Sequence, residues 1–137
     1  MHLNKSTRYA LHAGLEMALA GDRPVTANQV AQRYEIPENV VAKVLQQLAR
    51  AGVARGVRGV GGGYCLVRAP ADVAVQDLID IFEPVPPPDT CMLRDVPGER
   101  CPGDDSPRCR LMHLFQEVDE TVRATFASVS LATLSGS

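Results

Sequence analysis

The sequence predicts a mainly α-helical protein that carries one short β-hairpin. Hydrophobic residues make up 45% of the 137 residues, yet aromatic residues make up only 4% and Trp is absent. The core must therefore be built from Ala, Val, Leu and Ile, which suits packed helices. Apolar residues recur at three- and four-residue spacing in several segments, and one glycine-rich basic segment breaks this period. A chain of this length forms one domain, or a small domain with an appended element.

Start and stop signals divide the first 52 residues into three helices. The first runs from about Ser6 to Leu19 and is ended by the sequence GDRP. Thr26 and Gln29 have the spacing of a capping box, which satisfies orphan N–H groups at the start of a short second helix. Pro37 opens a third helix, whose Val and Leu residues form one apolar stripe and which an Ala-Gly pair should end.

Two short helices joined by a tight turn, the second with polar and basic side chains facing outward, match the helix-turn-helix arrangement of DNA-binding domains. An ordinary helical hairpin has the same periodicity, so the next segment is decisive. Residues 53–68 place β-branched and aromatic residues on both sides of a glycine-rich, basic centre, which is typical of a hairpin with a flexible tip. The predicted fold is a winged helix-turn-helix domain with a two-stranded β wing.

The distribution of charge favours a nucleic-acid partner for the first half of the chain. Residues 1–68 carry nine Lys or Arg against four Asp or Glu, a net charge of +5, whereas residues 69–137 carry five against twelve, a net charge of −7. A solvated charged face produces the same counts, so this asymmetry alone leaves the partner open.

Six residues are candidates for contacts with DNA. Asn39 and Lys43 lie one turn apart near the start of the third helix and could reach base edges or phosphates in the major groove. Arg55 and Arg58 place cations beside whatever the wing touches. The remaining two could hold phosphate, although helix capping explains them at least as well; these are Thr26 and Gln29.

The first twenty residues do not have the pattern of an export signal, because charged and polar residues interrupt the apolar ones at helical spacing. No apolar run approaches the roughly 18 residues that are needed to span a bilayer. We therefore expect a cytoplasmic protein, whose cysteines face a reducing compartment in which structural disulfides are rare.

The second half of the chain changes character twice. After one short amphipathic helix at Val75–Phe82, residues 84–109, here called the cysteine segment, contain seven prolines and three of the four cysteines. Loops of such length are usually functional or disordered. A long helix from Arg110 to about Ser130 then carries an apolar stripe at close to heptad spacing, which we expect to pack against a second copy of the chain. Burial against the chain's own first helix is the alternative, and the two can hold together.

The three cysteines of this segment favour a metal or redox function. Nine residues separate Cys91 from Cys101, and seven separate Cys101 from Cys109, so the tight Cys-x-x-Cys pair of zinc sites is absent. Iron-sulfur clusters are larger, and a long loop can supply widely spaced thiolates to them. His113, one helical turn beyond Cys109, is the candidate for the last bond. A reactive thiol sensor and an incidental set of cysteines remain alternatives. Cys65, inside the second wing strand, is expected to be an ordinary buried thiol.

The order of these motifs resembles a known family. The motifs are, in chain order, RYALHAGLEMALA, the helix-turn-helix sequence, the wing VRGVGGGYCL, VAVQDLIDIFEP, three cysteines and a terminal helix. In this order of motifs the chain resembles the Rrf-two family of bacterial winged-helix transcription regulators. The similarity covers nearly the whole chain and is greatest to the branch of the iron-sulfur cluster regulator IscR. The wing and the cysteine triplet are the most specific parts of it.

The resemblance implies a homodimer that binds a palindromic operator, with the presence or oxidation state of a cluster setting DNA affinity. Cys91, Cys101 and Cys109 would hold the cluster, with a 2Fe-2S cluster favoured over 4Fe-4S. In IscR-like members the fourth ligand is a His three residues after the third cysteine. That position is Met112 here, and His113 follows it, so His113 or a His12 from the partner subunit is the candidate. Arg58 would enter the minor groove from the wing.

Two other functions remain open at this point. A thiol-based redox regulator would use the same three cysteines without a cluster, and a metal- or cluster-handling protein would not bind DNA. An enzyme is not expected, because the three His are scattered and no catalytic set or phosphate loop occurs. The predicted organisation is a DNA-binding domain at residues 1–83, a cluster-binding loop at 84–109 and a dimerisation helix with its tail at 110–137.

Overall fold

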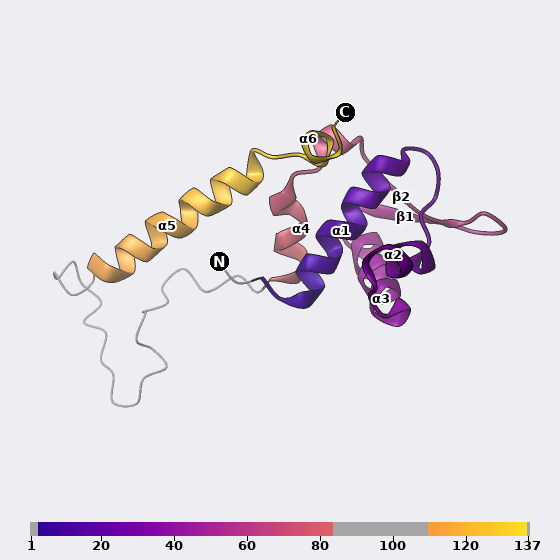
Figure 1. Cartoon of the computed structure of the whole chain (residues 1–137). Helices are drawn as coiled ribbons and strands as arrows, with labels where there is room; N and C mark the ends of the chain where they lie inside the picture. Colours follow the sequence, from indigo (N-terminus) through magenta and orange to yellow (C-terminus); the bar gives the residue numbers. More distant parts are fainter. Residues whose placement is uncertain (1–2, 84–109, 137) are drawn as a thin grey trace. The chain divides into compact units, whose positions relative to one another are not determined.

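The computed structural model describes residues 3–83 and 110–136 (Figure 1). Helices dominate these residues, and one antiparallel hairpin accompanies them, as predicted. By contacts, the chain divides into one unit of residues 1–83 with 126–137, and a second unit of residues 84–125. The elements in chain order are α1 (Lys5–Ala20), α2 (Ala27–Tyr34), α3 (Glu38–Arg50), β1 (Ala54–Val57), β2 (Gly63–Leu66), the 3₁₀ turn η1 (Pro70–Asp72), α4 (Val75–Phe82), α5 (Arg110–Ala127) and α6 (Leu131–Ser135).

The core of the first unit is aliphatic, as the composition requires. Helix α1 buries a face of small residues and packs against α3, α4 and α6. Small residues let helices approach closely, and a Cβ added at Gly14 would come within 2.9 Å of the Leu78 side chain. Helix α3 buries the predicted apolar stripe, except that Val40 is only half-buried. The fully buried large side chains of this core are Met17, Val30, Val41, Val44, Leu45, Leu48, Val73, Leu78 and Leu131.

The signals that separate α2 from its neighbours act as predicted, with one addition. The Thr26 hydroxyl accepts from the Gln29 N–H at 3.1 Å, and Gln29 Oε1 accepts from the Thr26 N–H at 3.0 Å, which completes the capping box. At its other end α2 is stopped by Glu35 in the left-handed region, with φ 55° and ψ 47°. The turn into α3 therefore depends on a non-glycine left-handed residue, which the sequence pattern does not reveal.

The hairpin β1–β2 is the predicted wing, and its base is joined to the segment before α2 (Figure 1). Val25 and Tyr64 exchange two backbone hydrogen bonds, of 2.9 and 2.8 Å, which form an isolated bridge beside the two-stranded sheet. Gly63 makes this approach possible. Its φ is +149°, and a Cβ there would lie 2.6 Å from the carbonyl oxygen of Val25. The wing is thus fixed at its base to the start of the helix-turn-helix.

The C-terminal helix is shorter than predicted. We expected one helix to about Ser130, but α5 ends at Ala127, and Val129 lies outside it, before Ser130, which is extended and bridged to Ala74. Backbone hydrogen bonds with residues at and just before the start of α4 hold this stretch: the Val75 N–H donates to the Val129 carbonyl, and the Leu131 N–H donates to the Val73 carbonyl, both at 2.9 Å. Ser130 then caps the additional helix α6, whose Leu131 is completely buried.

A hydrogen-bond network joins the start of α1 to the end of α4. Asn4 caps α1 through its side-chain oxygen, which accepts from the Thr7 N–H at 2.8 Å, and its amide donates to the Phe82 carbonyl at 2.9 Å. The buried Thr7 hydroxyl donates to Glu83 Oε1 at 2.6 Å. Glu83, the residue before the cysteine segment, is therefore held against the N-terminus of α1.

Candidate nucleic-acid interface

The outward face of α3 carries two of the predicted DNA contacts. Asn39 and Lys43 lie one turn apart and are exposed, and the opposite face of the helix is buried in the core. The helix cannot rotate without removing its apolar stripe from that core, so the direction of these side chains is fixed by packing. Three further exposed polar residues continue the same helix toward its end: Gln46, Gln47 and Arg50.

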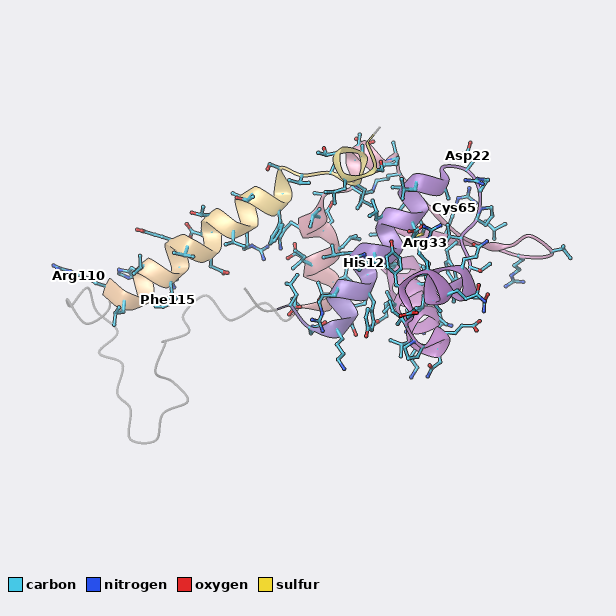
Figure 2. All side chains as sticks on the ribbon, viewed as in Figure 1. His12, Asp22, Arg33, Cys65, Arg110 and Phe115 are labelled. Atoms are coloured by element: carbon cyan, nitrogen blue, oxygen red, sulfur yellow. The ribbon has the colours of Figure 1, made fainter. Side chains whose placement is uncertain are left out.

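The wing carries two exposed cations in the same unit as α3. Arg55 lies on β1 opposite Cys65, and Arg58 follows the end of β1 at the start of the tip. Cys65 itself is buried, and its thiol donates to the carbonyl oxygen of Asp22 at 3.7 Å (Figure 2). Cys65 is thus the ordinary core thiol that we expected.

Thr26 and Gln29 both cap the N-terminus of α2. Each of these side chains accepts from the other residue's backbone N–H group, so the residues are needed for the helix whether or not they also contact phosphate. An exposed helix face next to a basic hairpin can bind duplex DNA through both elements. A major groove about 12 Å wide accepts a helix, and the hairpin then reaches the neighbouring groove or backbone.

A cluster of polar side chains connects α2 to α1. The Tyr34 hydroxyl donates to Glu16 Oε1 at 2.6 Å, and Arg33 Nε lies 3.5 Å from the same oxygen. His12, which is exposed on α1 and labelled in Figure 2, contacts the Tyr34 ring in a tilted arrangement, with centroids 4.6 Å apart and the ring planes at 39°. This contact gives His12 a partner within its own chain.

Titration of Tyr34 tests this cluster. Burial, and then the hydrogen bond and negative charge of Glu16, raise the pKa of Tyr34 from 10.0 to about 12, against a smaller opposing effect of Arg33. Because the folded pKa is the higher one, the stabilisation is complete below pH 10 and is lost between about pH 10 and 12. We expect tyrosinate absorbance to rise near pH 12 in the native chain and this step to be absent from Tyr34→Phe. A wild-type titration identical to that of Tyr34→Phe would contradict the cluster.

Of the four predicted cluster ligands, only His113 lies in the described part of the chain. It is exposed on the first turn of α5, whereas Cys91, Cys101 and Cys109 fall outside the described residues. Within residues 3–83 and 110–136, no group of three His, Cys, Asp or Glu side chains converges. The predicted donors are three thiolates and one imidazole, and this set fits an iron-sulfur cluster.

Helix α5 presents a strongly apolar surface. Leu111, Leu114, Phe115 and Val118 follow one another at helical spacing, and each is between 52% and 60% exposed. Phe115 is labelled near the start of the helix in Figure 2. Glu117, Asp119 and Glu120, also exposed, supply a polar face to the same helix.

Comparison with known proteins identifies the family. The model of the Rrf2 (Rrf-two) family, described as an iron-dependent transcriptional regulator, matches residues 3–137. The chain belongs to the Rrf2 family. It is 38% identical over 135 residues to an HTH-type transcriptional regulator, BadM, of Rhodopseudomonas palustris, covering 98% of this chain and 81% of that protein. It is 28% identical to the HTH-type transcriptional regulator IscR of Photorhabdus laumondii, covering 98% of this chain and 79% of the relative.

The fold of this chain is similar to that of a solved structure. CymR, the global cysteine regulator of B. subtilis, superposes with a TM-score of 0.80 at 24% identity, and the superposition covers 99% of this chain and 97% of CymR. The fold is therefore a winged helix-turn-helix, and this Rrf2 chain is a transcription regulator and not an enzyme. In the part of the chain that the structure describes, no helix is long and apolar enough to cross a membrane.

Proposed function

We propose that the chain is a DNA-binding regulator whose affinity for a palindromic operator is set by an iron-sulfur cluster on Cys91, Cys101, Cys109 and His113. The exposed polar face of α3, with the basic wing beside it, carries the DNA-binding part of the proposal. The cluster part of the proposal is supported by the set of three cysteines and one histidine, and by the similarity to IscR along 98% of the chain. We favour a 2Fe-2S cluster.

A second copy of the chain is the proposed partner of α5. The four exposed apolar residues at its N-terminal end would be covered when two such helices pack together. A twofold dimer then presents two α3 helices to two half-sites, and operators of this kind have half-sites one helical turn apart. The distance between the two α3 helices therefore sets the affinity.

Both ends of the intervening chain are tied to the same unit. Glu83 is held by Asn4 and Thr7 at the start of the cysteine segment, and Leu131 is buried after the end of α5. A bound cluster would supply a redox-sensitive link among the cysteines of that segment. Asn4 and Thr7 hold Glu83, the residue before the segment, and Leu131, which follows α5, is buried in the same unit, so we expect a change in the cysteine segment to reach the helix-turn-helix through both chain connections. The cluster can change the free energy of DNA binding by at most the difference between its binding free energies for the two dimer states.

A thiol-based regulator without a cluster is the second candidate. The high similarity to the CymR fold is as compatible with this function as with the first, and the same three cysteines would be oxidised instead of ligating iron. Iron and sulfide content separates the two functions.

Iron analysis of anaerobically purified protein tests the cluster. We expect matched iron and acid-labile sulfide with visible absorption, and we expect Cys101→Ala to lose most of both. Cys65→Ala is the matched control, because Cys65 is buried in the wing and should leave the metal content unchanged. A chain that stays colourless after anaerobic reconstitution would eliminate the cluster and favour the thiol regulator.

Salt-dependent binding tests the DNA interface. On duplexes selected by the wild-type chain from a random pool, Lys43→Ala and Arg58→Ala are each expected to weaken binding by about tenfold, and a lost phosphate contact lowers the slope of log affinity against log salt by about 0.9. Lys5→Ala is the control, because it removes an exposed cation from the first turn of α1, outside α3 and the wing. Equal affinities for all four proteins would contradict the interface.

A further inference from the structure

The tip of the wing exposes an aliphatic side chain that nothing in the described chain covers. Val60 has a relative exposure of 110%, the highest of the exposed large hydrophobic residues in the described part of the chain. It stands between Gly59 and Gly61, which have φ of +97° and +78°, and the Gly62 N–H closes the turn onto the Gly59 carbonyl at 3.0 Å. The turn therefore presents Val60 at the end of the hairpin.

The residues of the tip cannot bury the Val60 side chain. Its neighbours on both sides are glycines, which offer no side chain to pack against, and the hairpin base is anchored by the Val25–Tyr64 hydrogen bonds. A β-branched residue is also stiff about χ1, so ordering it on a partner costs little side-chain entropy. Val60 is presented as a small, rigid apolar surface.

The surroundings of Val60 identify the kind of partner. Arg58 lies two residues away and Arg55 five, both exposed, so the surface that meets the tip is negatively charged around a narrow apolar feature. A protein interface needs a larger apolar patch than one side chain among glycines. The minor groove of DNA, about 6 Å wide, combines phosphate edges with walls of deoxyribose carbon.

We propose that Val60 makes an apolar contact with the deoxyribose walls of the minor groove, while Arg58 provides the charged contact beside it. The glycines on either side keep the tip narrow enough to enter the groove. This inference rests on the proposed function, since it requires that the chain binds duplex DNA.

The salt dependence of binding separates an apolar contact from a charged one. Loss of a phosphate contact releases fewer counterions and lowers the slope of log affinity against log salt. Loss of an apolar contact lowers affinity by the same factor at every salt concentration, because no ion is released by it. Val60 and Arg58 variants should therefore weaken binding in two distinguishable ways.

The experiment compares Val60→Thr and Val60→Ala with Arg58→Ala on duplexes that the wild-type chain selects from a random pool. Thr has nearly the shape of Val but replaces a methyl group by a hydroxyl, and no protein contact is lost at a fully exposed site. Val67→Thr is the matched control, since Val67 is 51% exposed but follows the wing's second strand instead of forming its tip.

We expect both Val60 variants to bind about three- to tenfold more weakly at all salt concentrations, with the wild-type slope, and Val67→Thr to match the wild type. Wild-type affinity of Val60→Thr and Val60→Ala would overturn the inference and leave the proposed function standing, as would a reduced slope in these variants. A wild-type chain that binds no duplex at low salt would overturn both.

Discussion

Replacing Leu131 by Ala is expected to lower the free energy of unfolding of the first unit by about 2–5 kcal/mol. Leu131 is completely buried and belongs to the same core cluster as Leu78 of α4, and its δ carbons would lie 3.5 and 3.8 Å from a Cβ placed on Gly14 of α1. Truncation leaves a cavity between these helices. Urea unfolding followed by circular dichroism measures the loss.

Leu134→Ala is the control for this substitution. Leu134 lies in the same short helix but is 54% exposed, so its truncation should change the free energy of unfolding by no more than about 0.5 kcal/mol. Equal unfolding midpoints for Leu131→Ala and the wild type would show that α6 is not anchored in this core. In that case the residues that follow α5 would also lack the anchor that the proposed regulation requires.

Replacing Gly63 by Ala is expected to destabilise the wing by about 3 kcal/mol and to weaken DNA binding at the same time. The added Cβ would lie 2.6 Å from a backbone oxygen, at a φ of +149° that L residues rarely adopt. The chain must then break the paired Val25–Tyr64 hydrogen bonds or distort β2. Amide hydrogen exchange at Val25 and Tyr64, with the affinity for selected duplexes, measures both effects.

Gly61→Ala separates the steric clash from the backbone preference. Gly61 also has a positive φ, +78°, but no atom lies within 4 Å of an added Cβ. Its substitution should cost only about 1 kcal/mol and leave the exchange of Val25 and Tyr64 unchanged. If Gly63→Ala behaves like Gly61→Ala, the wing is not held by its base.

The helices and the wing could be predicted because their signals are local. The Thr26–Gln29 capping box, the apolar stripe of α3 and the glycine-rich hairpin each depend on residues close in sequence. The left-handed Glu35, by contrast, is a non-glycine residue with a positive φ, and no composition rule identifies such a position. The turn it makes was visible only in the structure.

Contacts between segments that are distant in the sequence could not be predicted from local sequence patterns. The apolar pattern continues smoothly through Val129, so periodicity extended the last helix past Ala127, where pairing with residues 73–75 ends it. The Thr7–Glu83 hydrogen bond joins residues 76 positions apart, and the Val25–Tyr64 bridge is equally non-local. Of the candidate site, residues on α3 and the wing lie where the sequence predicted exposed polar surface, whereas the thiolate ligands stay a prediction from cysteine spacing and resemblance.

The most direct measurement of the central claim is the DNA affinity of one anaerobic preparation before and after its cluster is removed by chelation and oxidation, at fixed salt and with thiols reduced afterwards. The proposed regulation predicts that the two affinities differ by about five- to 150-fold, the usual range of coupling between sites, and that Cys101→Ala shows no such difference. Equal affinities of the cluster-bound and cluster-free protein would contradict the claim that a cluster on this chain controls its binding to DNA.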